Sequence, residues 1–181
     1  MKELWFISVE TFGPSNEGWE KYIQWSKLTQ LKEVVGLDCS LCPAVIRELS
    51  EEDWDHVVAE NFLICYFRDR EYLTSRTRDV ADKHILGVVL EPDTDERSRI
   101  VKDGEFLGYD LIERQTSISA LTNCQGFPES FDNQELNEFG LLSEYLRARQ
   151  IQHALSTNNP EEPHANTDLW AIWKLQDSVV S

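Results

Sequence analysis

Long hydrophobic runs are missing from this sequence. The longest uninterrupted apolar run covers residues 85–90 and contains Gly87, far short of the roughly 20 residues that a membrane-spanning helix needs. The N-terminus has neither the basic region nor the long hydrophobic region of a signal peptide. We therefore expect a protein that does not enter a membrane and that resides in the cytoplasm.

Cysteines and the common catalytic motifs are also scarce. Four cysteines among 181 residues are too few for a disulfide scaffold, so reduced thiols are expected. The eight glycines are scattered singly, and neither a glycine-rich phosphate loop nor a GxSxG or HExxH motif is present. Because no complete catalytic set appears, the sequence favours a protein that is not an enzyme and that carries no cofactor and no metal.

Cys39 and Cys42 form the one recognised short motif. Thiols two residues apart can form a reversible disulfide or supply half of a zinc site. The carboxylate of Asp38 opposes ionisation of Cys39, which disfavours the redox role. A zinc site needs two more ligands, for which Cys124 and His164 are the candidates. A thiol-redox or metal-binding protein that uses Cys39 and Cys42 is thus the alternative function, and ordinary buried thiols are the simpler interpretation.

Positive charge is in short supply. The chain has 17 Lys and Arg against 33 Asp and Glu, which gives a net charge of −16. Residues 48–61 and 115–146 contain no Lys or Arg. Such a surface repels nucleic-acid backbones and attracts basic proteins. An acidic surface also serves solubility alone, as in many bacterial cytosolic proteins.

The acids of these two stretches lead to a specific hypothesis. We expect those on helix faces to form one continuous negative surface that is the partner-binding site. It would consist of Glu51, Glu52 and Asp55 lying near Glu135 and Glu138 or Glu144. The function that fits is a non-catalytic binding protein, of the inhibitor or immunity type, that docks a basic protein.

Aromatic residues are plentiful, with eight Phe, six Trp and five Tyr. They indicate a folded core, and the length fits one globular domain over residues 1–181. Most of the tryptophans have core-like spacing. Trp170 and Trp173 have opposite parity on an expected strand, so they should point to opposite faces. One of the two is therefore the candidate for an exposed, partner-binding tryptophan.

The order of expected elements predicts the fold class. Strands are expected at residues 3–11, 31–38, 84–90, 106–113 and 169–175. Helices are expected at residues 16–28, from Ser50 through Phe62, at residues 69–79 and at residues 142–155, and residues 44–49 fit either a strand or a short helix. Because strands and helices do not alternate regularly, we predict an α+β domain. Its sheet should be mainly antiparallel or mixed, with about five strands and three to four helices.

Overall fold

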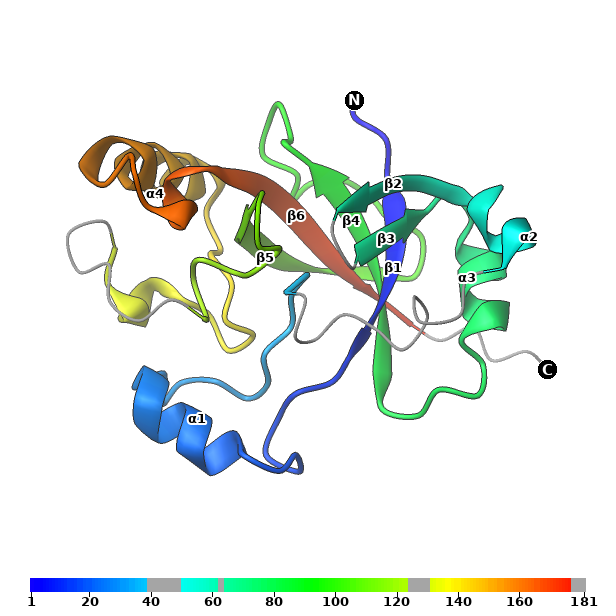
Figure 1. Cartoon of the computed structure of the whole chain (residues 1–181), viewed down its shortest axis with the longest axis horizontal. Coiled ribbons are helices and arrows are strands. Elements are labelled where there is room, and N and C mark those ends of the chain that lie inside the picture. The colour runs from blue at the N-terminus through cyan, green and yellow to red at the C-terminus, as the bar shows by residue number, and fades with distance from the viewer. Residues whose placement is uncertain (39–49, 62–63, 124–130, 177–181) are drawn as a thin grey trace.

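An antiparallel sheet forms the centre of the protein (Figure 1). The computed structural model describes residues 1–38, 50–61, 64–123 and 131–176. In these residues the sheet has six strands in the order β2-β3-β1-β4-β6-β5, and each neighbouring pair is antiparallel. The strands are β1 (Trp5–Glu10), β2 (Val57–Asn61), β3 (Ile64–Phe67), β4 (Lys83–Leu90), β5 (Gly104–Glu113) and β6 (Thr167–Leu175). The predicted α+β class is confirmed, with one strand more than expected.

Helices lie at both ends of this sheet. The described residues contain four of them: α1 (Trp19–Ser26), α2 (Glu51–Trp54), α3 (Arg70–Arg76) and α4 (Tyr145–Asn158). In Figure 1, α1 and α4 lie toward one end of the longest axis, and α2 and α3 lie toward the other. None of the helices in the described segments has the length and apolar character needed to cross a bilayer.

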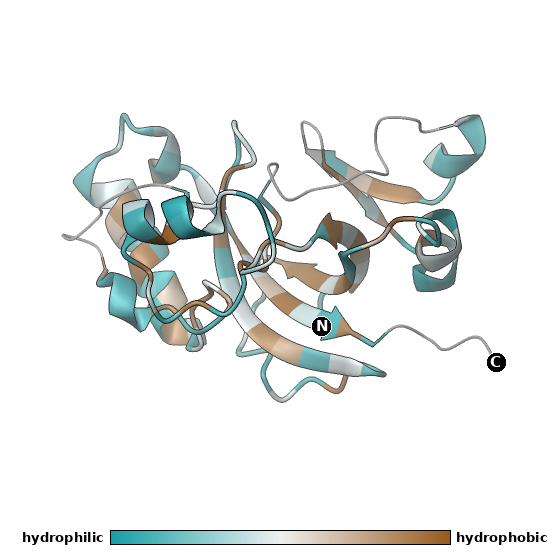
Figure 2. Ribbon diagram, turned by 90° about the horizontal axis from the view of Figure 1, so that it is seen from below, coloured by the Kyte–Doolittle hydropathy of each residue, from teal (hydrophilic) through white to brown (hydrophobic). Residues whose placement is uncertain are grey.

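Side chains that alternate along the strands divide the core into two clusters. One cluster packs against the helices and includes Trp173. The other includes Trp170 and packs against the segments that contain Val35 and Leu141. Brown, hydrophobic positions recur along the strands, whereas teal dominates the helices at the periphery (Figure 2). The predicted opposite orientation of the two tryptophans is confirmed, but the prediction that one is exposed is wrong, because both are buried.

Residues 31–38 do not form the predicted strand. Val34 makes a single antiparallel bridge with Phe12. The neighbouring backbone N–H groups of Lys32 and Val35 instead donate to the carbonyl oxygens of Glu138 and Phe139, at 2.8 and 3.0 Å. Because these backbone partners belong to two separate segments, no continuous ladder forms.

The helix predicted from Ser50 through Phe62 is also wrong beyond its first turn. It begins after the expected cap, Ser50, and ends at Trp54. Residues 57–61 then form β2, which pairs with β3. β-Branched residues such as Val57 and Val58 favour extended backbone. Residues 44–49 lie outside the described residues.

Candidate functional site

A buried carboxylate, Asp53, connects α2 to α3. Asp53 and Ser50 cap α2 reciprocally: the backbone N–H of Ser50 donates to Oδ2 of Asp53 at 2.7 Å, and the backbone N–H of Asp53 donates to the Ser50 hydroxyl. Oδ1 of Asp53 accepts hydrogen bonds from the Tyr72 hydroxyl at 2.7 Å and from Nε of Arg76 at 3.0 Å. Burial raises the pKa of Asp53, but the hydrogen bonds from Tyr72, Ser50 and Arg76 outweigh burial and hold the pKa well below its usual range. Asp53 is therefore an ionised structural anchor.

The turn that follows α2 is fixed to α3 at a second point. The imidazole ring of His56 stacks on the phenol ring of Tyr72, with centroids 3.6 Å apart and an interplanar angle of 7°. The same Tyr72 donates its hydroxyl hydrogen bond to Asp53. Asp53 and His56, one on each side of residues 54–55, both contact Tyr72. These two contacts hold the turn against α3, so its orientation is well defined.

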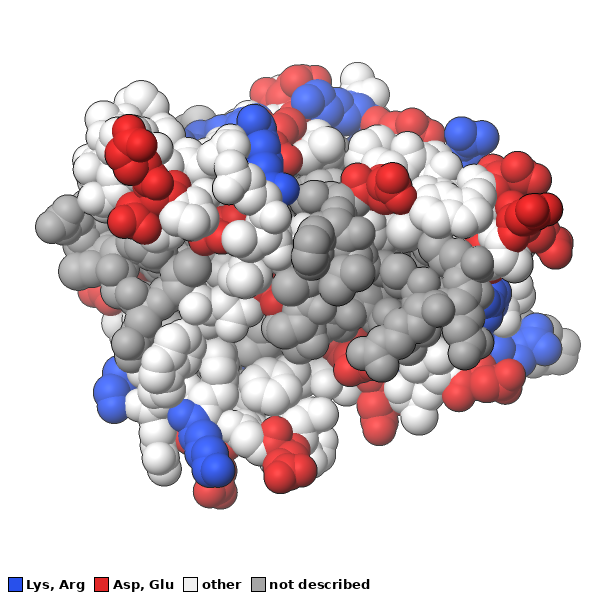
Figure 3. All heavy atoms as spheres, in the orientation of Figure 1, with Lys and Arg blue, Asp and Glu red and all other residues white. Residues whose placement is uncertain are grey.

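The side chains of Glu51, Glu52, Trp54 and Asp55 point away from this anchor, and we call them the α2 corner. All four are exposed, and Trp54 has an exposed fraction of 48%. Acidic side chains gather over α2 in Figure 3. Within the described part of the chain, none of the three carboxylates takes part in an ion pair. The α2 corner thus presents a large aromatic ring among three uncompensated charges.

The predicted continuous acidic surface is not formed. The 3-10 turn Asn133–Glu135 lies at the end of the longest axis opposite to α2 (Figure 1). The acids of this second group have basic partners: Glu135 pairs with Arg147 at 2.5 Å, Glu138 with Lys32 at 2.6 Å and Glu144 with Arg97 at 2.5 Å. The hydrogen bond from Arg147 lowers the pKa of Glu135 to about 2. Of the predicted binding residues, Glu51, Glu52 and Asp55 lie together, whereas Glu135 and Glu138 belong to a separate, neutralised surface.

The predicted thiol site cannot be located in the structure. Cys39, Cys42 and Cys124 lie outside the described residues, so the thiol-redox or metal-binding role stays a prediction. Cys65 is buried on β3, and burial raises its pKa to about 11, which keeps it a thiol at neutral pH. Among residues 1–38, 50–61, 64–123 and 131–176, no group of three His, Cys, Asp or Glu side chains is arranged to hold a metal ion.

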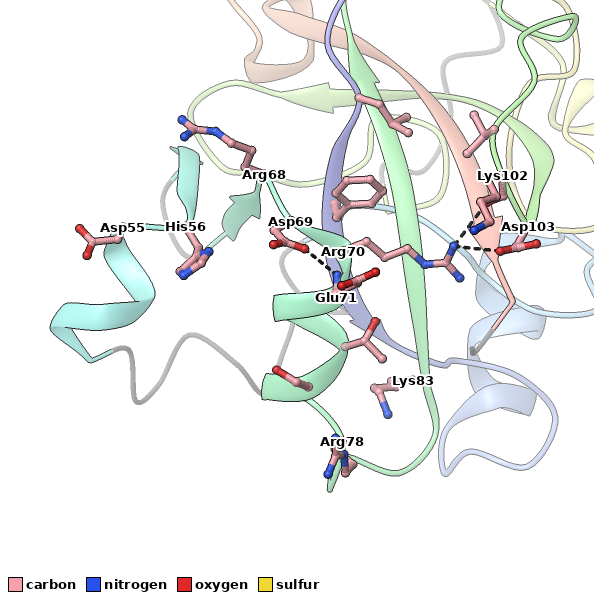
Figure 4. A pocket seen from close by; sticks show the side chains of 15 residues that line it. Asp55, His56, Arg68, Asp69, Arg70, Glu71, Arg78, Lys83, Lys102 and Asp103 are labelled. Atoms are coloured by element: carbon pink, nitrogen blue, oxygen red, sulfur yellow. Dashed lines mark hydrogen bonds and ion pairs between the residues drawn. The ribbon is translucent and has the colours of Figure 1, made fainter. Parts of the chain in front are cut away.

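A hollow with many charged side chains lies beside the α2 corner (Figure 4). It has a volume of about 1170 Å³. Its lining comes from four regions: β1 with the residue before it, the turn after α2, the segment from Arg68 to Lys83 that contains α3, and residues 101–103. Asp55 and His56 line it, so it adjoins the α2 corner directly. The sequence analysis did not predict this hollow. The arginines around α3 are evident in the sequence, but the other lining residues come from distant segments.

Asp110 is a second buried carboxylate, in the middle of β5. Its Oδ1 accepts hydrogen bonds from the backbone N–H of Leu111 at 2.8 Å and from the Ser119 hydroxyl at 2.7 Å. The backbone N–H of Ser119 donates to Asp38, whose carboxyl group is also buried. Burial raises the pKa of Asp110 to about 7, and the charge of Asp38 acts in the same direction.

The raised pKa of Asp110 predicts a pH-dependent stability. Between about pH 4, the ordinary pKa of an aspartate, and pH 7, the folded state binds a proton that the unfolded state has lost. The free energy of unfolding should therefore fall as the pH rises through this range. Asp110→Asn should remove this pH dependence. Between pH 5 and pH 8 the free energy of unfolding of the wild type should therefore fall by over about 1 kcal/mol more than that of the variant.

Urea unfolding at pH 5 and at pH 8 measures the free energy of unfolding of the wild type and of Asp110→Asn. Asp79→Asn is the matched control, because Asp79 is exposed after α3, and it should follow the wild type at both pH values. Parallel behaviour of the wild type and Asp110→Asn would contradict the prediction.

Comparison with known proteins provides no relative. No protein family, no curated protein and no solved structure matches this chain. The functional argument therefore depends on the geometry described above.

Proposed function

We propose that this protein is a cytoplasmic, non-catalytic binding protein that docks a basic protein through the α2 corner. The observation that carries the proposal is Trp54, which is 48% exposed among Glu51, Glu52 and Asp55. Tryptophan is enriched at the energetic centres of protein interfaces. Carboxylates around it would steer a basic partner and select it by charge.

The rigidity of the α2 corner supports a docking role. Asp53 anchors α2 through Ser50, Tyr72 and Arg76, and His56 stacks on Tyr72. A surface that is already ordered loses little conformational entropy when a partner binds. The ordered geometry would therefore favour affinity at this small surface.

The charge of the whole chain supports a basic protein as the partner. A net charge of −16 favours long-range attraction of a cation and opposes the approach of nucleic acid. An inhibitor or immunity-type protein, which covers the basic surface of another protein, fits this requirement. Glu135 and Glu138 have no part in this revised surface, because Arg147 and Lys32 neutralise them.

The proposal is tested by affinity capture from the native lysate at low and at moderate salt. The wild type should recover a basic protein at low salt. Recovery should fall as salt increases, because charge steering is screened beyond about 8 Å at physiological ionic strength. Trp54→Ala should reduce recovery at least tenfold, and Glu51→Lys/Glu52→Lys should reduce the association rate of the recovered protein with little effect on folding.

Two matched variants separate a specific surface from general properties of the chain. Trp25→Ala removes the other tryptophan of the described residues that is largely exposed, at 42% on α1. Glu161→Lys/Glu162→Lys makes the same charge change at exposed acids elsewhere. Both controls should retain capture. Equal losses in the controls and in the α2 variants, or no recovery of a basic protein at either salt concentration, would contradict the proposal.

A further inference from the structure

Ser119 joins two buried carboxyl groups. Its hydroxyl donates to Oδ1 of Asp110 on β5 at 2.7 Å, and its backbone N–H donates to Oδ2 of Asp38 at 2.8 Å. The side-chain amide of Asn123 donates to the same oxygen of Asp38. Asp38 and Asp110 are each only 1% exposed. Three separate segments of the chain therefore meet at a pair of buried acids.

The backbone of residues 36–37 contacts the carboxyl group of Asp110. The N–H of Leu37 donates to this group, and a Cβ added at Gly36 would lie 2.8 Å from Oδ2. Only glycine allows so close an approach of the backbone. In Figure 1 residues 31–38, which we call the α1 connector, lead from α1 toward the sheet. The α1 connector is thus bound to β5 through Asp110.

Asp110 has hydrogen-bond donors but no ion-pair partner within the described part of the chain. Its donors are the N–H groups of Leu37 and Leu111 and the hydroxyl of Ser119, which are all neutral. None of the ion pairs between described residues includes Asp110. A buried carboxylate without a positive partner is costly, so the folded state favours the protonated form. Because Oδ1 accepts from Leu111 and Ser119, the proton belongs on Oδ2, the oxygen beside Gly36.

The titratable groups around Asp110 do not compensate its charge. Burial is the main cause that raises the pKa of Asp110, and the charge of Asp38 raises it further. Burial and the same two acids raise the pKa of Tyr22 on α1, so its phenol stays neutral. On the segments around Asp110, Lys32 pairs with Glu138, Glu33 with His84 and Lys174, and Asp168 with Arg114. An ionised Asp110 would therefore be repelled by Asp38 inside the core.

We propose that protonation of Asp110 controls whether the α1 connector stays bound to β5. Loss of the proton places a second anion beside Asp38. The connector then separates from β5, and water reaches both carboxylates. This device is independent of docking at the α2 corner, because the two share no residue.

The opening is local because the connector is held less continuously than the central strands. Its backbone N–H groups donate to the carbonyl oxygens of Phe12, Glu138 and Phe139, which belong to two separate segments. β4, β6 and β5 instead form continuous ladders. Segments with few backbone hydrogen bonds open at a lower free energy than core strands.

The direction of the pH effect follows from the pKa of Asp110 in the two states. Burial raises this pKa to about 7 in the closed state, whereas a hydrated aspartate has a pKa of about 4. Between these values the closed state binds one proton more than the open state. Opening should therefore increase by up to about tenfold per pH unit. Above about pH 7 Asp110 is deprotonated in both states, so the effect levels off.

Hydrogen exchange of the full chain, followed by NMR from pH 5 to pH 8, tests the proposal. The reporters are the N–H groups of Lys32 and Val35, which donate to Glu138 and Phe139, and the N–H of Ser119. Their protection factors correct for the pH dependence of the intrinsic exchange rate. These factors should fall at least about tenfold from pH 5 to pH 7 and then stay constant. At every pH they should be lower than those of the β4–β6 ladder.

Two substitutions assign the effect to the pair of acids. Asp110→Asn has no titrating group at this position, so the reporters should be equally protected at pH 5 and at pH 7. Asp38→Asn removes the charge that adds to burial in raising the pKa of Asp110, so the pH at which protection levels off should shift downward. A purely structural role of Asp38 would lower protection without this shift. Asp79→Asn, at an exposed acid after α3, is the matched control and should behave like the wild type.

The NMR shift of the Asp110 carboxyl carbon gives the same midpoint in the wild type without any substitution. Three results would overturn the proposal. The first is constant protection of the reporters between pH 5 and pH 7. The second is a pH dependence that persists in Asp110→Asn. The third is protection of the reporters equal to that of the β4–β6 ladder, which would show global unfolding. Trp54→Ala should keep the pH dependence of the wild type, so failure of the docking proposal and failure of this one are distinguishable.

Discussion

A chain that ends at Asn166 should show no cooperative unfolding transition. This truncation removes β6, which lies between β4 and β5 and pairs with both. It also removes Trp170 and Trp173 from the two core clusters. Without β6, β4 loses one of its two neighbouring strands, and β5 loses the one strand that lies beside it in the sheet of the described residues. The loss of both core tryptophans alone costs several kcal/mol, comparable to the stability of a whole domain.

Circular dichroism during thermal unfolding measures this effect. A second chain that ends at Gln176 retains β6 and separates the loss of this strand from the loss of residues 177–181. A chain ending at Asn166 that melts as sharply as the intact protein would show that β6 is not integral to the sheet.

Asp53→Ala should lower the free energy of unfolding by about 2 kcal/mol. It removes the half of the capping box in which the Asp53 carboxylate accepts from the backbone N–H of Ser50, which is worth up to about 1 kcal/mol, and it leaves the half-buried hydroxyl of Tyr72 without its acceptor, which costs about 1 kcal/mol. The pair with Arg76 adds little, because the Arg76 side chain is 35% exposed and solvent screens it. For a chain of this size the melting temperature should fall by roughly 5 °C.

Asp55→Ala is the matched control for Asp53→Ala. Asp55 is the next acid in the same turn but is exposed, so its replacement should change stability by less than about 0.5 kcal/mol. Differential scanning calorimetry compares the two variants. Equal melting temperatures of Asp53→Ala and Asp55→Ala would show that Asp53 does not anchor α2.

The lowered pKa of Asp53 gives this prediction a pH dependence. The folded state holds Asp53 ionised below its ordinary pKa of about 4, so its contribution is present above about pH 4 and is lost as the pH falls further. The difference in unfolding free energy between the wild type and Asp53→Asn should therefore shrink from pH 6 to pH 3. Urea unfolding at these two pH values measures it, and a constant difference would contradict the assignment.

The sequence predicted the central strands well because their residues face apolar surroundings on both sides. β4 and β6 lie inside the sheet. Their apolar runs identify them as strands even when the strands that pair with them are unknown. The hairpin of β2 and β3 was missed, because the helix signal at Ser50 was extended through Val57 and Val58. That error placed Trp54 inside a helix from Ser50 through Phe62, whereas α2 ends at Trp54 and leaves its ring exposed.

The candidate site was only partly predictable for the same reason. Glu51, Glu52 and Asp55 belong to a stretch without Lys or Arg, and they were correctly expected to be exposed acids. The pairing of Glu138 with Lys32 joins distant segments, which sequence spacing cannot reveal. The hollow was invisible for a similar reason, because Phe6, Arg68 and Lys102 meet only after the sheet has formed.

A photo-crosslinking amino acid at position 54 tests the central claim most directly. With benzoylphenylalanine in place of Trp54, irradiation in the native cells should give an adduct with a basic protein. The same adduct should disappear when Glu51→Lys/Glu52→Lys is added, and it should be absent when the crosslinker replaces Trp25, the exposed tryptophan on α1. No adduct at position 54, or identical adducts at positions 54 and 25, would contradict the assignment of the α2 corner as a docking surface.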